Sequence, residues 1–296
     1  MKNVKLFHRT ALEWYSRNAR IFAWRGERDP YRILISEMMS QQTQIARVVI
    51  YYERWLKAFP TIAALAAASK RDVLREWSGL GYNSRALRLH ACAKTAVALY
   101  HGKLPRTVEE LLALPGIGRY TANAVVCSAY RKPVPVVEVN IRRIFSRVFF
   151  EVMSADEMQT EKDTWTIAES VLAKDDAFRW NQALMDIGAL FCTARSPKCG
   201  ACPLRKFCLS ADSPVFLTPA RKKKSGEPAF LGVPRRLYSG KILKLLHTGP
   251  MSEADIAQRL WTEIGDREAA WLRHVLELME KSALISRRGN KISVAA

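Results

Sequence analysis

Apolar residues recur at three- and four-residue intervals along the first two thirds of the chain, the spacing that places them on one face of an α-helix. This spacing runs through residues 32–59, 71–77, 85–100 and 108–114, and an alanine-rich stretch at 61–69 predicts a further short helix. Prolines at positions 30, 60, 105 and 115 fall between these segments, where they begin or end helices. Strand-like alternation is missing from residues 5–208, so this part is predicted to be all-α.

The last third of the chain follows a different pattern. Residues 210–234 contain four prolines, two glycines and the run Arg221–Lys224, which predicts a flexible basic linker. Helical spacing returns at 236–247, 252–260 and 267–282, and residues 284–294 predict a β-hairpin that turns at Gly289-Asn290. Three helices and a hairpin outline a winged helix, so we expect a helical domain at 1–209, the linker at 210–234 and a small α+β winged-helix-like domain at 235–296.

Charge indicates the kind of partner. The 296 residues carry a formal net charge of +19, which favours a polyanion. A ribosome-associated protein or a membrane-surface binder would also be basic. However, we find no basic amphipathic helix with a continuous apolar face and no apolar stretch near the roughly 20 residues that a membrane span needs. The first nine residues lack the apolar core of a signal peptide, so we expect a cytoplasmic, nucleoid-associated protein.

Four of the six cysteines are clustered. Cys92 and Cys127 lie in apolar helical contexts and are expected to be inert core residues. The other four lie within 17 positions, with six, two and five residues between successive cysteines, and these are Cys192, Cys199, Cys202 and Cys208. In a chain of this size, such a group predicts a metal or cluster site rather than disulfides. Four thiolates suit zinc or an iron–sulfur cluster, although the two Cys-x2-Cys pairs of a zinc ribbon are missing.

A two-glycine turn separates two of the helical segments. Gly116 and Gly118, within Leu114–Ala122, permit a tight turn and leave free amide groups at the start of the next helix. Such a turn can bind a DNA phosphate. About 20 residues later, Glu138 begins another helical segment and is followed by Arg142 and Arg143.

In combination, these features resemble the helix–hairpin–helix (HhH-GPD) base-excision DNA glycosylases, and most closely the MutY-type adenine glycosylases. The matching stretches are Phe22–Arg25, Asp29–Tyr31, Ser36–Gln44, Gly79–Tyr82, Leu114–Thr121, Asn181–Asp186 and the four clustered cysteines. The resemblance covers residues 5–210 and implies two α-helical lobes with the target base held between them. It also implies that the four cysteines hold a 4Fe–4S cluster, and that the partner is duplex DNA with a damaged or mispaired base, bound by a monomer.

The chemistry of base removal accounts for two carboxylates. Breaking an N-glycosidic bond requires an acid for the departing base and an anion near the cationic sugar. The resemblance gives the acid's role to Glu37, whose apolar neighbours are expected to raise its pKa. It gives the anion's role to Glu138, with Asn140 beside it in the catalytic group. The family carries Asp at that position, and a carboxylate displaced by about 1 Å can cost about a hundredfold in rate.

The resemblance also assigns the remaining site residues. Tyr120 stands where bifunctional relatives carry a Schiff-base lysine, and a phenol cannot form that imine, so a monofunctional enzyme is expected. Lys132, the next lysine, has no features of such a nucleophile. The residues assigned to DNA contact are Gln41, Gln42, Tyr82, Gly116, Gly118 and Arg142.

The adenine glycosylases that this chain resembles often carry a C-terminal Nudix-like domain that recognises oxidised guanine. No such pattern follows Ser210, so the C-terminal third departs from the family. The predicted winged helix could bind DNA, with Arg287, Arg288 and Lys291 on its wing, or it could dock a protein. This departure, together with Glu138, leaves three hypotheses open. The first is an adenine glycosylase acting opposite 8-oxoguanine or guanine. The second is a glycosylase for mismatched thymine or uracil, or for another modified base. The third is a catalytically silent binder of damaged DNA.

Overall fold

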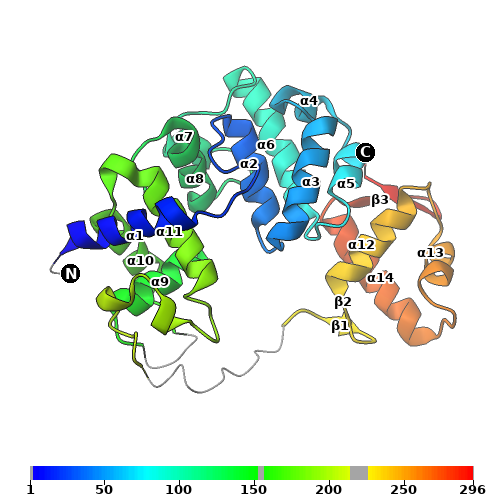
Figure 1. Cartoon of the computed structure of the whole chain (residues 1–296). Helices are drawn as coiled ribbons and strands as arrows, with labels where there is room; N and C mark the ends of the chain where they lie inside the picture. Colours follow the sequence, from blue (N-terminus) through cyan, green and yellow to red (C-terminus); the bar gives the residue numbers. More distant parts are fainter. Residues whose placement is uncertain (1–2, 153–156, 214–225, 296) are drawn as a thin grey trace. The chain divides into compact units, whose positions relative to one another are not determined.

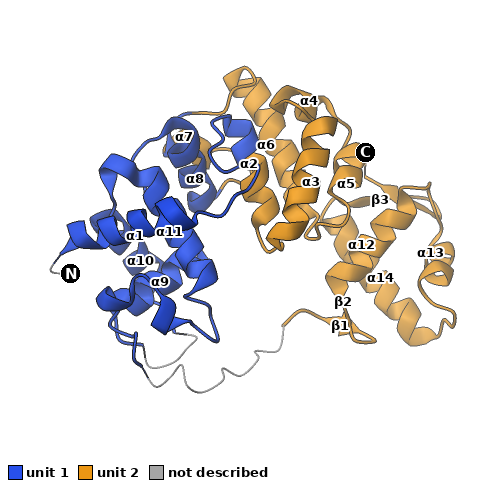
Figure 2. Ribbon diagram, in the orientation of Figure 1, with its two compact units in different colours: residues 1–33, 106–108, 118–223 blue, residues 34–105, 109–117, 224–296 orange. Residues whose placement is uncertain are grey.

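The structure is a computed structural model, which describes residues 3–152, 157–213 and 226–295 (Figure 1). The chain divides into two compact units (Figure 2). The first unit comprises residues 1–33, 106–108 and 118–223, and the second comprises residues 34–105, 109–117 and 224–296. No helix in the described ranges is long and apolar enough to cross a membrane.

The first unit is helical and packs around one apolar core. Its long helices are α1 (Val4–Asn18), α8 (Arg119–Tyr130), α9 (Val139–Phe149), α10 (Glu161–Ser170) and α11 (Ala177–Leu190). Short 3-10 turns lie at η1 (Lys174–Asp176), η2 (Cys199–Ala201) and η3 (Arg205–Phe207). Phe7 is fully buried and meets Trp180 and Phe207 edge-to-face, both at 5.2 Å between ring centroids. This aromatic contact joins α1 to α11 and to the segment that carries the clustered cysteines.

The helical part of the second unit consists of six helices. They are α2 (Pro30–Ser40), α3 (Ile45–Ala58), α4 (Ile62–Ala67), α5 (Lys70–Trp77), α6 (Ser84–Tyr100) and α7 (Val108–Leu112); α2 and α7 each begin in the first unit. The periodic stretch 32–59 is therefore interrupted at Gln41–Gln44, where the backbone leaves the helical conformation. Trp55 and Trp77, both fully buried, meet edge-to-face at 5.4 Å and fix α3 against α5. The all-α prediction for this part is confirmed.

The C-terminal part of the second unit has the predicted order of three helices and a hairpin. The helices are α12 (Arg235–Leu246), α13 (Glu253–Leu260) and α14 (Asp266–Lys281), followed by the antiparallel pair β3 (Ile285–Arg288) and β4 (Lys291–Val294). Met251, between α12 and α13, bridges Ile292 of β4. The winged-helix-like fold is confirmed.

The structure differs from the prediction at the end of the expected linker. The two-residue strands β1 (Ala229–Phe230) and β2 (Val233–Pro234) pair within residues 226–234 and bring Phe230 onto Trp271, with ring centroids 5.5 Å apart. Strands this short have no recognisable alternation, which is why the sequence pattern did not predict them. The basic run Arg221–Lys224 lies outside the described residues.

Candidate active site and cysteine loop

Glu138 caps the N-terminus of α9 and belongs to a chain of hydrogen bonds. Its Oε1 accepts a hydrogen bond from the backbone amide of Ile141 (3.1 Å), and its Oε2 accepts one from Nδ2 of Asn140 (3.0 Å). Asn140 Oδ1 accepts in turn from Nη2 of Arg143 (2.6 Å). The buried Arg143 also donates to the carbonyls of Gly188 (3.0 Å) and Cys192 (2.5 Å). The carboxylate is thus oriented by a network that ends at the first clustered cysteine.

The environment of Glu138 acts on its charge in two directions. Burial raises the pKa of its carboxyl group above the ordinary value, because the anion loses contact with water. The hydrogen bonds from Asn140 and Ile141 and the nearby positive charge of Arg143 oppose that rise. This carboxylate lies in a partly dehydrated site, where the field of its anion acts strongly on a nearby cation.

The helices on both sides of this network approach closely at Gly188. A Cβ added to Gly188 of α11 would lie 2.7 Å from the Cβ of Asn140. Only glycine therefore lets α11 come close enough to receive the hydrogen bond from Arg143.

Two of the stretches that carry the family resemblance, Phe22–Arg25 and Asn181–Asp186, fix the segments around this network. Asn181 accepts from the amide of Val136 (3.1 Å) and donates to the carbonyl of Val134 (3.0 Å), which fixes the segment before Glu138. Asp186, with no exposed surface, accepts from Arg20 (2.8 Å) and from Arg25 (2.9 Å). The stretches Phe22–Arg25 and Asn181–Asp186 are therefore partners in space.

Tyr120 lies in the first turn of α8 and packs, half-buried, against the core of the first unit. Lys132 lies beyond the end of α8 and is exposed. Tyr120 is therefore a fixed residue of the helix, whereas Lys132 is a solvent-exposed lysine.

The turn before α8 requires one of its two glycines. Gly116 has φ +77°, in the left-handed region, and an added Cβ would lie 2.6 Å from the Cβ of Arg88. Gly118 is the N-cap of α8 with φ −96°, and nothing lies within 4 Å of an added Cβ. The backbone at Gly118 therefore faces open space, where another molecule can approach it.

Glu37 lies in the last turns of α2 and is half-buried. Ile35, Met38 and Met39, its apolar neighbours in the sequence, are almost completely buried. They are therefore committed to the core of the second unit. The acid's role of Glu37 stays a prediction.

Gln42 and Tyr82 lie at the tips of two loops in strained backbone conformations. Gln42 has φ +56° and Tyr82 has φ +47°, values that L-residues rarely adopt. Gln42 is exposed, and Tyr82 is 40% exposed despite its large aromatic ring. Such strain persists only where surrounding structure holds it, and it concentrates at functional sites.

Arg85, which the sequence reasoning missed, is the group that holds both loops. Its guanidinium is buried and donates to the carbonyls of Met38 (2.9 Å) and Gln41 at the end of α2, and to Oγ1 of Thr43 (3.1 Å). It also donates to the carbonyl of Gly81 (3.0 Å), next to Tyr82. Burial lowers the pKa of Arg85 to about 10, which still leaves it charged at neutral pH. No motif signals such a residue, because its role depends on contacts between separate loops.

Arg142 is engaged inside the first unit. Its guanidinium donates from Nε (2.8 Å) and Nη2 (2.5 Å) to the carbonyl of Gln159, and the side chain is half-buried. The structure thus gives Arg142 a bracing contact, and its predicted role in DNA binding stays a prediction.

The clustered cysteines come together next to the core of the first unit. Cys192, Cys202 and Cys208 pack against it. The buried Arg147 donates to the carbonyls of Thr193 (2.8 Å) and Ala194 (3.0 Å) and lies 3.5 Å from Sγ of Cys192. Cys208 Sγ lies 3.1 Å from the carbonyl of Arg147. Arg147 therefore braces the loop and places positive charge beside the sulfur atoms.

The thiols of the clustered cysteines need a cationic partner in order to ionise, which the irons of an iron–sulfur cluster would supply. Burial and, to a lesser extent, the neighbouring thiolates raise the pKa of Cys202 to about 11 and that of Cys208 to about 12, so cationic irons would be needed to ionise them. In a 4Fe–4S cluster, four thiolates hold a body larger than one ion. By comparison, Cys92 and Cys127 are buried core residues, as predicted, and burial raises the pKa of both thiols.

Comparison with protein families gives two matches. Residues 35–170 match the HhH-GPD superfamily of base excision DNA repair proteins. Residues 192–208 match the iron–sulfur binding domain of endonuclease III. The chain therefore carries a 4Fe–4S cluster, as expected.

Individual relatives cover most of the chain. It is 37% identical over 281 residues to the adenine DNA glycosylase of Mycobacterium tuberculosis, covering 93% of this chain and 89% of that protein. It is 40% identical over 250 residues to the adenine DNA glycosylase of Mycolicibacterium smegmatis, covering 83% and 82%. A solved structure of a thermostable thymine-DNA glycosylase superposes with a TM-score of 0.66 at 31% identity, covering 71% of this chain and 97% of that one.

Proposed function

We propose that this chain, which belongs to the HhH-GPD superfamily of base-excision DNA repair glycosylases, removes adenine mispaired with 8-oxoguanine or guanine and leaves an abasic site. The choice of adenine is supported by the mycobacterial relatives named adenine DNA glycosylase, which the chain matches over most of its length. The proposed substrate is duplex DNA, which the net charge of +19 would attract. The protein would act as a monomer in the cytoplasm, where the chromosome lies.

The observation that carries the proposal is the hydrogen-bond network around Glu138. As the bond between sugar and base lengthens, positive charge develops on the sugar and negative charge on the base. A carboxylate oriented by Asn140 and the Ile141 amide would stabilise the positive charge without reorganising. Because these hydrogen bonds anchor Glu138, the network would hold its longer side chain in the place of the family's Asp.

Glu37 and Tyr120 complete the proposed chemistry. Glu37 would protonate the departing purine, which leaves more readily as a neutral base. Tyr120 cannot form an imine with the sugar, so water completes the reaction and the DNA strand stays intact.

The proposed interface with DNA has three parts. The amides at Gly116 and Gly118 would bind a phosphate, and Arg142 would support that region of the backbone. Gln41, Gln42 and Tyr82 would enter the helix where the base leaves it. Extruding a base from the duplex costs about a few kcal/mol, and a mispaired base costs the least. This difference contributes to selectivity. The cluster would be held by Cys192, Cys199, Cys202 and Cys208, and would stabilise the loop that Arg147 braces.

The test is a gel assay with duplexes that contain A opposite 8-oxoguanine, A opposite G, T opposite G and U opposite G. Strand breakage only after alkali, and only at adenine, is expected. The Glu138→Gln variant should release the base about 10²–10⁴-fold more slowly. Asn123→Ala, which truncates a buried side chain of α8, is the matched control and should keep the parent rate. Breakage without alkali would contradict the role of Tyr120.

A second substrate class is supported by one observation. The superposed structure at 31% identity is named a thymine-DNA glycosylase. Release of thymine or uracil, and not adenine, in the same assay would favour this second class over adenine.

A further inference from the structure

The three elements of the C-terminal domain that could face DNA differ in charge. Helix α12 carries four basic residues and no acidic one. Helix α14, the third helix, which enters the major groove in helix-turn-helix proteins, carries four acidic residues against three basic ones, or a net −1. A helix of that charge is repelled by phosphates, whereas α12 is attracted to them.

The wing is partly neutralised by ion pairs. Arg287 lies 3.2 Å from Glu253 of α13 and 3.5 Å from Glu280 of α14. Lys291 lies 3.7 Å from Asp255. Two of the three wing cations predicted to contact phosphate are therefore already paired with carboxylates of their own domain.

Helix α12 borders a cavity of roughly 570 Å³ within the second unit. One side is formed by the α12 residues 236–244, and the other is formed by residues 42–47 and 78–83. Arg71 of α5 donates to the carbonyl of His247, just after α12 (2.9 Å), and Arg236 lies 6.0 Å from the ring centre of Tyr82. The cavity therefore has α12 on one side and both strained loop tips on the other.

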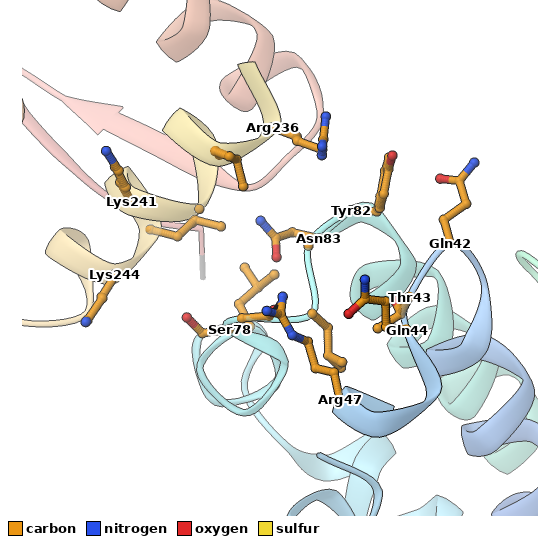
Figure 3. A pocket seen from close by; sticks show the side chains of 17 residues that line it. Gln42, Thr43, Gln44, Arg47, Ser78, Tyr82, Asn83, Arg236, Lys241 and Lys244 are labelled. Atoms are coloured by element: carbon orange, nitrogen blue, oxygen red, sulfur yellow. Dashed lines mark hydrogen bonds between the residues drawn. The ribbon is translucent and has the colours of Figure 1, made fainter. Parts of the chain in front are cut away.

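The charges at this cavity are of one sign. Its lining includes four cations and, within the described part of the chain, no carboxylate. Arg236 is paired with Glu227, which precedes β1. Arg47 donates from Nη1 to the carbonyl of Gly79 (3.0 Å) and is exposed, as are Lys241 and Lys244. Figure 3 shows Lys241 and Lys244 on the α12 side of the cavity, and Arg47 and Tyr82 on the opposite side. In Figure 3 the ammonium groups of both lysines point away from the cavity, which suits a polymer that passes outside it better than a small anion enclosed inside.

We propose that the C-terminal domain binds the phosphodiester backbone of duplex DNA through Lys241 and Lys244 of α12, together with Arg47 across the mouth of this cavity, and not through α14 or the wing. This inference rests on the proposed function only in taking DNA as the substrate. It gives the domain a binding orientation different from the usual one for a winged helix. It also places backbone contact beside Gln42 and Tyr82, so that binding by α12 positions the DNA over these two tips.

The test measures the salt dependence of DNA binding by the full-length, cluster-loaded protein. The probe is a fluorescent duplex with one tetrahydrofuran abasic analogue, which no glycosylase can cleave, and anisotropy gives the dissociation constant between 50 and 200 mM salt. Each lost phosphate contact reduces the slope of log K against log salt by about 0.9. The double variant Lys241→Ala/Lys244→Ala should therefore lower the slope by about 1–2.

Two matched variants remove the same number of charges from the same domain. Arg273→Ala/Lys281→Ala changes α14, and Arg287→Ala/Arg288→Ala changes the wing. In both variants the slope of log K against log salt should stay within about 0.3 of that of the parent. A slope unchanged in the α12 variant, or lowered equally by either control, would overturn the inference. Base release by the parent protein under single-turnover conditions is measured separately. Because the probe contains no base to remove, failure of the parent to release adenine would refute the proposed function alone.

Discussion

Replacing Asn140 by alanine tests the network around Glu138 through two linked quantities. The side chain of Asn140 donates one hydrogen bond to the carboxylate at 3.0 Å, while the amide of Ile141 and the charge of Arg143 remain. A hydrogen bond to a charged group contributes about 1.5–3 kcal/mol, and the low end applies where other donors persist. A loss of about 1.4 kcal/mol corresponds to a tenfold change in rate and to about one pKa unit.

The sign of the pH effect follows from the form that is stabilised. Burial already raises the pKa of Glu138, and removing a donor to the anion raises it further. Since the anion is the proposed active form, the rate falls as the pH is lowered through this pKa. In Asn140→Ala the fall should begin about one pH unit higher than in the parent.

The assay is single-turnover release of adenine from a mismatched duplex, followed from pH 5 to pH 8. Asn140→Ala should be about tenfold slower on the plateau, with its acid limb displaced upward. Asn123→Ala removes a buried amide that donates to the carbonyl of Arg119 (2.8 Å), and should change neither quantity. A folded Asn140→Ala protein with an unmoved acid limb would refute the reasoning.

Further predictions concern the parts that hold the site. Gly116→Ala should lower the free energy of unfolding by about 2–3 kcal/mol in a denaturant titration, because of its positive φ and its contact with Arg88, whereas Gly118→Ala should be nearly neutral. Arg85→Lys should lower it by about 2–4 kcal/mol and weaken DNA binding by anisotropy, since one ammonium cannot serve all the acceptors of the guanidinium. Cys202→Ser should reduce or abolish the visible absorbance and bound iron of the purified protein; full retention of both would contradict its role as a ligand.

Sequence periodicity predicted what depends on local spacing. The helices, the order of three helices and a hairpin, and the burial of Cys92 and Cys127 follow from the apolar pattern and are confirmed. The turn at Gly116 was also predictable, because glycine readily adopts the positive φ found there.

Contacts between distant segments were not predictable from the pattern. Nothing in the spacing links Arg143 to the carbonyl of Cys192, 49 residues away, or Arg85 to the end of α2. The same limit applies to the wing, since the carboxylates that pair with Arg287 come from two other helices. The short strand containing Phe230 was missed because a two-residue strand has no periodicity.

The single guanidinium of Arg85 has a consequence for local opening of the protein. Because it bonds to the loop before Gln42 and to the loop before Tyr82, neither loop can detach without exposing acceptors that belong to the other. The two loops should therefore open as one cooperative unit, with a common protection factor in native-state hydrogen exchange. The entropy of ordering both tips is then lost during folding, so no further ordering of the tips would be needed when a ligand binds there.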